Sequence, residues 1–175
     1  MKIWFISDTH FGHANILTFT TETGVRVRPE FETVEQMDEA MIERWNARVK
    51  PSDHIYHLGD VTMKREVLHR VLPRLQGKKR LLRGNHDIFR TKDYAKHFEE
   101  IGASRVLDNI LFTHIPVHPL SLGRFTANVH GHIHEKPAFG SRYVNISVEQ
   151  TQYAPIAFED VQARVAAFSL VEVSQ

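Results

Sequence analysis

Five short runs with the character of strands, each followed within three residues by an acid, an imidazole or an amide, constrain this chain more than any other feature of its sequence. The polar residues are Asp8 and His10 after the run 2–7, Asp60 after 54–58, Asn85 and His86 after 79–82, His114 after 110–113, and His132 and His134 after 127–130. Runs of this length are typical of buried strands. Ligands of open α/β sheets bind where the carboxyl ends of the strands meet, so we expect these side chains to share one rim.

The residues between the runs predict an α/β layered fold of one domain, residues 1–175. We expect helices over 33–49, 64–75 and 92–101, a short helical turn over 15–19, and a loop over 20–32. The strands 104–107 and 110–113 are predicted to form a hairpin through Asp108 and Asn109. A further strand is expected over 143–146, and the last segment is either a helix over 158–167 or a strand over 165–173.

Spacing within two of the polar groups supports a shared site. Asp8 and His10, like His132 and His134, stand two residues apart. On an extended chain, residues i and i+2 point to the same side, so both members of each pair would face the site.

Composition narrows the chemistry. The chain has 12 histidines and no cysteine, which excludes disulfides and thiolate ligands and suits a reducing compartment. Its formal net charge is +1, so broad nucleic-acid binding is not favoured, although it stays possible. We find no signal peptide and no apolar stretch of about 18–20 residues, and therefore expect a cytoplasmic protein without a membrane span.

The set of donor atoms predicts a metal centre. Asp, His and Asn together suit Mn²⁺, Fe or Zn²⁺, and we favour Mn²⁺. Seven candidate ligands exceed what one tetrahedral site uses, whereas two cations sharing Asp60 as a bridge would use them all. Two metals about 3.5–4 Å apart are the usual arrangement for hydrolysing phosphate esters. Turn propensity alone explains Asp and Asn at strand ends, but not the histidines.

The ordered motifs DTH (8–10), GD (59–60), GNHD (84–87), His114 and GHIH (131–134) resemble the calcineurin-like metallophosphoesterase family. The opening SDTHFGHANI and the later NISVEQTQYAPIAFEDV are similar to a compact bacterial and phage subgroup of predicted phosphoesterases. The resemblance implies a four-layer α/β/β/α sandwich and attack on phosphorus by a metal-bridging hydroxide. The chain departs from the protein-phosphatase branch after Asp60, where it reads Val-Thr-Met-Lys instead of carrying an acid and an arginine.

The same resemblance implies roles for individual residues. One metal would be held by Asp8, His10, Asp60 and His134, and the other by Asp60, Asn85, His114 and His132. It also implies that His86 contacts the phosphate and protonates the leaving oxygen, with Asp87 orienting the His86 ring. We therefore expect a hydrolase acting on a small, nucleotide-like phosphomonoester or phosphodiester.

Several residues have two readings. His13, Arg83 and His118 could each contact the substrate. Alternatively, His13 lies on the surface, Arg83 forms a salt bridge on a sheet face, and His118 lies outside the pocket. His57 is expected to be a hydrogen-bonded interior histidine, and His130 to have a structural role in its strand. Two other functions stay open: a nuclease acting on DNA or RNA ends, and a non-catalytic binding scaffold of the same fold.

Overall fold

A mostly parallel sheet delivers the first three polar groups to one edge. The computed structural model describes residues 1–138 and 140–172. The sheet has the order β4-β3-β2-β1-β9. Its strands are β1 (Ile3–Ile6), β2 (His54–His57), β3 (Lys78–Leu82), β4 (Glu100–Gly102) and β9 (Ile156–Ala157). The strands β1 to β4 run parallel and β9 runs antiparallel to β1, so the chain leaves β1, β2 and β3 at the same edge.

A second sheet, of order β5-β6-β7-β8, supplies the other two groups. It contains β5 (Ser104–Leu107), β6 (Ile110–Thr113), β7 (Ala127–His130) and β8 (Tyr143–Asn145). The strands β5 and β6 form the predicted hairpin, with Asp108 and Asn109 at φ 46° and 62° in its turn. Because β6, β7 and β8 are parallel, His114 and the segment after His130 leave this sheet at a common edge.

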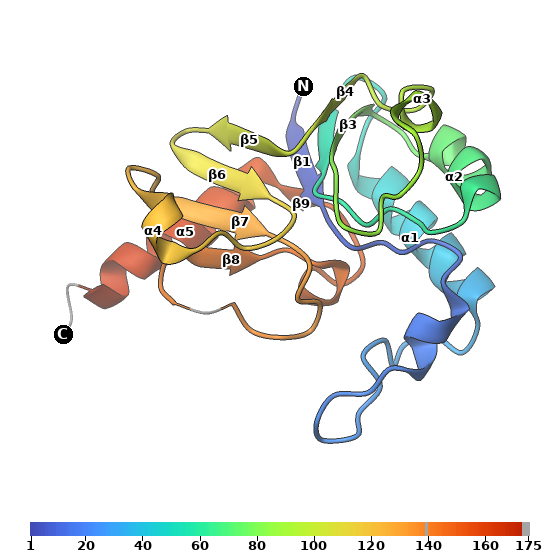
Figure 1. Ribbon diagram of the computed structural model, residues 1–175, viewed down its shortest axis with the longest axis horizontal. Coiled ribbons are helices and arrows are strands. Elements are labelled where there is room, and N and C mark those ends of the chain that lie inside the picture. Colours follow the sequence, from blue (N-terminus) through green and yellow to red (C-terminus); the bar gives the residue numbers. More distant parts are fainter. Residues whose placement is uncertain (139, 173–175) are drawn as a thin grey trace.

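Alternation along the strands builds two apolar cores. On β1, Trp4 and Ile6 face the helices, whereas Phe5 faces the second sheet and stacks on Phe112 of β6 with ring centroids 4.3 Å apart. The sheets therefore pack face to face, and β1 lies between β2 and β9 in the first of them (Figure 1). This packing brings the two sets of strand ends to one boundary.

Helices flank the paired sheets, as expected for the four-layer sandwich. The helical segments are η1 (Ala14–Thr18), α1 (Val34–Arg48), α2 (Arg65–Val71), η2 (Leu72–Arg74), α3 (Thr91–Tyr94), α4 (Pro119–Leu122), η3 (Val148–Gln150) and α5 (Phe158–Glu172). The helices α1 and α2 bury their apolar residues on the outer face of the first sheet. The helix α5 packs its Val161 and Val165 into the core between the sheets. The short α4 lies on the outer side of the second sheet. This placement is indicated by the adjoining Val117, whose backbone hydrogen-bonds with the side chains of the outward-facing Asn128 and Tyr143.

Two predicted elements were wrong. The helix expected over 92–101 ends at Tyr94, and residues 100–102 instead form β4, because Ile101 pairs with Leu81 at the sheet edge. The alternative strand over 165–173 is helical through Glu172 in α5, and its last residue lies outside the described part of the chain. The helix expected over 158–167 and the turn over 15–19 were confirmed. In the described residues, no helix is long and apolar enough to cross a bilayer.

Candidate metal centre

The candidate ligands meet at the boundary between the two sheets. Two groups of three residues each bring ligand atoms within 4.8 Å of one another: Asp8, His10 and His134 form one group, and Asp60, His114 and His132 form the other. Asn85 adjoins the second group, since its Oδ1 lies 2.9 Å from His114 Nε2. His10 Nε2 lies 3.5 Å from Asp60 Oδ2, which connects the two groups.

The backbone at the site is held in an unusual conformation. Among the described residues, nine residues other than glycine have positive φ, and five of them are candidate ligands. They are Asp8 (φ 59°), His10 (48°), Asp60 (59°), His132 (71°) and His134 (51°). The expectation that the paired ligands sit on extended chain was therefore wrong. Positive φ costs an L-residue free energy and is concentrated at functional sites, where the surrounding fold enforces it.

The polar atoms at the centre lack the partners that a closed protein interior would supply. His10 is 3% exposed, yet neither of its ring nitrogens has a hydrogen-bond partner among the described residues. Buried polar groups are nearly always paired, because each unmade hydrogen bond costs about 1–3 kcal/mol. A cation bound to the nitrogen that carries the lone pair would give that nitrogen a partner.

His114 presents the same requirement from the other side. Its Nδ1 donates to the carbonyl oxygen of Leu58 at 2.8 Å, so Nδ1 carries a proton. Its Nε2 faces Asn85 Oδ1 at 2.9 Å and Asp60 Oδ2 at 3.4 Å. Two oxygen acceptors facing this nitrogen need a positive charge among them, which either the second imidazole proton or a cation supplies, and a divalent cation fits this set of O and N donors.

The ionisation of the site agrees with this fit. Burial, reinforced by the charge of Arg28, holds the pKa of His10 well below its usual range, so the ring is in the neutral form that binds metals. Burial opposes ionisation of Asp60, but its hydrogen bond and charge interaction with His114 bring its pKa down to about 2. Asp60 is therefore a carboxylate, as a bridging ligand must be.

A buried ion pair that the sequence reasoning missed supports His134 and Asp8. Glu149 Oε1 lies 3.2 Å from His134 Nδ1 and accepts a 2.8 Å hydrogen bond from Arg28 Nε. The Arg28 guanidinium is fully buried and also donates to the backbone carbonyls of Asp8 and Thr9. Carboxylates that hold the second nitrogen of a ligand histidine fix its orientation. No local sequence pattern marks this pair, because 121 residues separate its members.

Asp87 holds the loops rather than the His86 ring. Its Oδ2 accepts from the backbone N–H of Asp60 (2.9 Å) and of Gly84 (2.8 Å), and its Oδ1 accepts from Val61 N–H (3.1 Å). The described contacts include no hydrogen bond between the Asp87 carboxylate and the His86 imidazole. The predicted orienting role is therefore corrected: Asp87 ties the strand end that carries Asp60 to the turn that carries Asn85.

Two glycines leave room for the ligands. A side chain at Gly84 would overlap the Asp60 carboxylate, and one at Gly131 would overlap the Ser7 hydroxyl and the Asp8 carboxylate. Asp8 also accepts hydrogen bonds from His132 N–H at 2.9 Å and from Ser147 Oγ at 3.0 Å. The backbone thus packs directly against the two acids.

His86 lies exposed at the mouth of the centre. Its backbone N–H donates to Asp60 Oδ1 at 2.9 Å, and its ring centroid is 5.6 Å from that of His10. The half-buried His13 ring lies 5.7 Å from the His10 ring, so it also borders the centre. Both imidazoles are therefore available to a group bound there.

Of the other two predicted substrate contacts, Arg83 lines a hollow beside the centre and His118 does not. Arg83 donates through Nη2 to the carbonyls of Asp87 and Phe89, so this nitrogen fastens the turn that carries Asn85. Arg83 still lines a hollow of about 360 Å³ beside Asn85 and His114. His118 caps α4 by accepting from Leu120 N–H at 3.3 Å, and it does not line this hollow.

Two histidines have the structural roles expected of them. His57 is buried between Thr9 Oγ1 (3.0 Å) and Gly59 N–H (3.1 Å), and burial lowers its pKa to about 3. His130 is buried in β7 and its Nδ1 lies 2.8 Å from Gly131 O.

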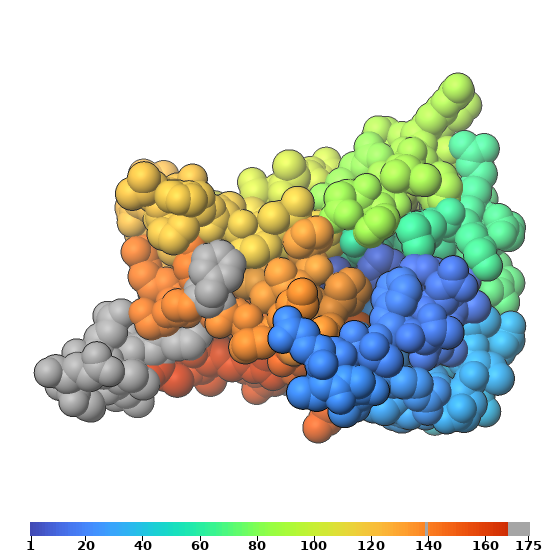
Figure 2. Space-filling view, turned by 60° about the horizontal axis from the view of Figure 1, so that its bottom comes forward, coloured from blue at the N-terminus to red at the C-terminus, as the bar shows by residue number. Residues whose placement is uncertain are grey.

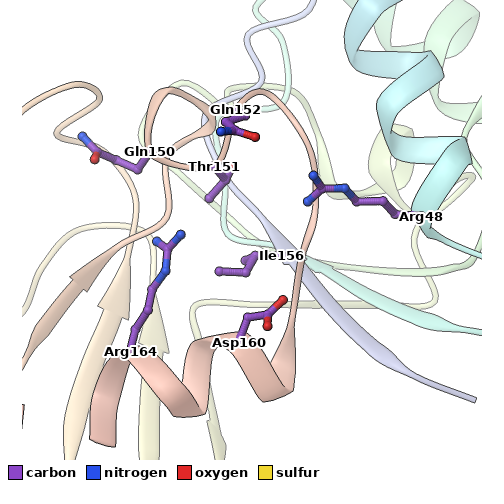
Figure 3. Close-up of a pocket in the computed structure, with 7 residues that line it drawn as sticks. All are labelled: Arg48, Gln150, Thr151, Gln152, Ile156, Asp160 and Arg164. Atoms are coloured by element: carbon purple, nitrogen blue, oxygen red, sulfur yellow. The ribbon is translucent and has the colours of Figure 1, made fainter. Parts of the chain in front are cut away.

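A separate hollow of about 380 Å³ lies beside η3 and the start of α5, away from the ligand side chains. Figure 3 shows the Arg48 and Arg164 guanidinium groups on its opposite sides, with Asp160 below. Its wall includes Gln150, whose side chain donates to the His134 carbonyl at 3.1 Å. The candidate chemistry lies elsewhere, at the boundary between the sheets.

Comparison with known proteins identifies the family. Residues 1–151 match the calcineurin-like phosphoesterase superfamily domain, so the chain belongs to this superfamily. It is 32% identical over 168 residues to an uncharacterized protein of Methanocaldococcus jannaschii, covering 90% of this chain and 88% of that protein. It is 30% identical over 88 residues to the gene 66 protein of Mycobacterium phage L5, covering 48% and 39% of the two chains. The crystal structure of a protein of unknown function from Aquifex aeolicus has a similar fold, with a TM-score of 0.72, 27% identity, and coverage of 93% of this chain and 98% of that one.

Proposed function

We propose that the chain is a hydrolase of phosphate esters that uses two divalent cations held around Asp60. The observation that carries this proposal is the convergence of ligand atoms: both ring nitrogens of the buried His10 lack a hydrogen-bond partner, and His114 Nε2 faces Asn85 and Asp60. Asp8, His10, Asp60 and His134 would hold one cation, and Asp60, Asn85, His114 and His132 the other. Because the donors are oxygen and nitrogen without sulfur, we favour Mn²⁺, with Fe or Zn²⁺ as alternatives.

Such a cation pair, when bound, would lower the pKa of a water molecule toward neutrality and would offset the charge on the phosphate oxygens. The protein's own contribution is to place a proton donor beside the leaving group. His86 can give its proton to the departing alkoxide, because its ring is exposed beside His10 while its backbone is fixed by Asp60. Asp87 maintains that geometry by holding the backbone N–H groups of Asp60 and Gly84.

The substrate that we propose is a small, exposed phosphomonoester or phosphodiester. Described hollows of about 260–360 Å³ adjoin the centre, which suits a ligand of nucleotide size. A nuclease would require a basic groove along the polynucleotide, and the formal net charge is only +1. The cysteine-free composition is consistent with a cytoplasmic location.

The test is a substrate panel with added Mn²⁺ on the wild type and three variants. The panel should compare an aryl monoester, an aryl diester, 2′,3′- and 3′,5′-cyclic nucleotides and short oligonucleotides. His86→Ala should bind metal normally but turn over about 10²–10⁴-fold more slowly on a poor leaving group, the usual contribution of a general acid. Asp60→Ala should lose both metal and activity, whereas the remote His69→Ala should lose neither.

Three outcomes would change the proposal. Full activity of His86→Ala on a substrate with a poor leaving group would remove the assigned role. Cleavage restricted to oligonucleotides, and strongly suppressed by salt, would favour the nuclease. Stoichiometric metal binding without turnover of any ester would favour the binding scaffold.

A further inference from the structure

A small hairpin beside the metal centre carries an aromatic ring that faces solvent. Residues 19–27 pair through a bridge between Thr20 and Arg26, with Val27 N–H donating to Phe19 O at 2.8 Å. Arg26 also forms an ion pair with Glu32 at 2.6 Å. In Figure 2 the blue atoms of this part of the chain lie beside the orange segment that follows β7. The ring of Phe19 is therefore presented by an ordered element.

Phe19 is exposed, whereas the other described Phe, Trp and Tyr residues are buried or half-buried. Its relative exposure is 50%. The rings of Phe19 and His13 form a T-shaped contact, with centroids 5.8 Å apart and the planes at 82°. Phenyl rings are usually buried, so a Phe residue left half exposed beside a candidate active site needs a reason.

The open ring lines a hollow that reaches the metal centre. This hollow, of about 260 Å³, is bounded by Ile16, Phe19, Thr20, Val27, His134, Glu135 and Lys136. His134 is a candidate ligand, and the rings of Phe19, His13 and His10 follow one another at 5.8 and 5.7 Å. A second hollow of about 610 Å³ shares Thr20, Glu135 and Lys136 with the first, so the two adjoin.

We infer that Phe19 stacks on a planar ring carried by the phosphate ester while the metal centre holds the phosphate. This inference rests on the proposed function and names its substrate class: nucleotides and other esters in which a heteroaromatic ring stands a few bonds from the phosphate. Aromatic side chains bind such rings by offset or edge contacts. The charged ends of Glu135 and Lys136, with the Thr20 hydroxyl, can pair with polar atoms on the edge of a base.

The experiment compares two ligands that differ only in the ring. Binding of adenosine 5′-monophosphate and of ribose 5-phosphate to the Mn²⁺-loaded protein would be measured by calorimetry, for the wild type, Phe19→Ala, Phe19→Leu, Phe19→Trp and Val25→Ala. Val25 is the control, because it is 56% exposed on the same hairpin but lines neither hollow. Circular dichroism would verify that each variant is folded.

The wild type and Phe19→Trp should prefer the nucleotide. Phe19→Ala and Phe19→Leu should lose about tenfold or more in affinity for the nucleotide and little for ribose 5-phosphate, which is the usual effect of losing one base–aromatic stack. Val25→Ala should match the wild type. No preference in the wild type, no binding of either ligand, or a preference unchanged by Phe19→Ala would overturn the ring site.

The two proposals can fail separately. If the wild type hydrolyses esters but Phe19→Ala keeps the nucleotide preference, the proposed function stands and the ring site is wrong. If nucleotide binding depends on Phe19 while no ester is turned over, the ring site stands and the hydrolase proposal fails.

Discussion

Replacing Glu149 with Gln should weaken both the fold and the metal centre, because Glu149 is the sole described carboxylate that contacts the buried Arg28. The Glu149 side chain is 3% exposed, and Arg28 is fully buried. Burial alone would raise the pKa of Glu149, but the charge of Arg28 and the contact with His134 bring it to about 2, so the group is ionised. The substitution keeps the shape of the side chain and removes its charge.

The magnitude follows from the cost of an uncompensated buried charge. Removing one partner of a buried ion pair typically costs about 3–5 kcal/mol. For a chain of this size, about 2–4 °C of melting temperature is lost per kcal/mol, so Glu149→Gln should melt roughly 6–20 °C lower. Loss of the contact that orients His134 should also weaken metal affinity about 10–100-fold.

Two measurements check this prediction. Thermal unfolding of the metal-free protein isolates the effect on the fold, and calorimetric titration with Mn²⁺ at a temperature where both proteins are folded isolates the effect on the metal. Glu39→Gln is the matched control, because Glu39 is 58% exposed and pairs with Arg74 on the surface at 2.5 Å. If Glu149→Gln melts within a degree or two of Glu39→Gln, Arg28 does not depend on Glu149 and the reasoning is refuted.

Three further results are expected. Asp87→Ala should lower both the midpoint of thermal unfolding and the turnover, because three backbone N–H groups lose their acceptor. Unchanged turnover of a folded Asp87→Ala variant would refute the positioning role of Asp87. Gly131→Ala should abolish Mn²⁺ binding measured by calorimetry, because the new methyl group overlaps the Ser7 hydroxyl. The control Gly102→Ala should bind Mn²⁺ as the wild type does, because no atom lies nearer than 3.8 Å to the new methyl group. Hydrogen bonds from backbone N–H groups lower the pKa of Asp53 to about 2. The contribution of Asp53 to the free energy of unfolding is therefore complete above about pH 4 and is lost as the pH falls toward 2. Urea titrations of Asp53→Asn should show that its free energy of unfolding decreases less with falling pH than that of the wild type.

More of the candidate site than of the contacts that support it could be predicted from the sequence. Positions such as Asp8 and His114 follow buried strands, and apolar runs of this kind are local signals. The rule that parallel strands end at one edge accounts for convergence within each sheet, and the packing of the two sheets face to face brings the two sets of side chains together. The hairpin through Asp108 and Asn109 was readable for the same reason, since both residue types tolerate the positive φ that the turn requires.

What the sequence did not show depends on distant partners. β4 replaces the end of a predicted helix because Ile101 finds Leu81 across the sheet, and such pairing has no local signature. The Arg28–Glu149 pair joins positions 121 residues apart. Asp87 was expected to serve the neighbouring His86, and only the fold reveals that its oxygens are taken by backbone N–H groups on both loops. The local sequence indicates which side chains are candidates for the site, whereas their contacts depend on how the whole chain packs.

The central claim is that seven side chains from five loops bind a pair of cations with Asp60 between them. Anomalous X-ray diffraction from crystals of the protein grown with Mn²⁺ tests it directly. We expect two anomalous peaks about 3.5–4 Å apart, one beside His10 and one beside His114, with an Asp60 oxygen contacting both. A single peak with no contact to Asp60, or no peak at this boundary at saturating Mn²⁺, would contradict the account.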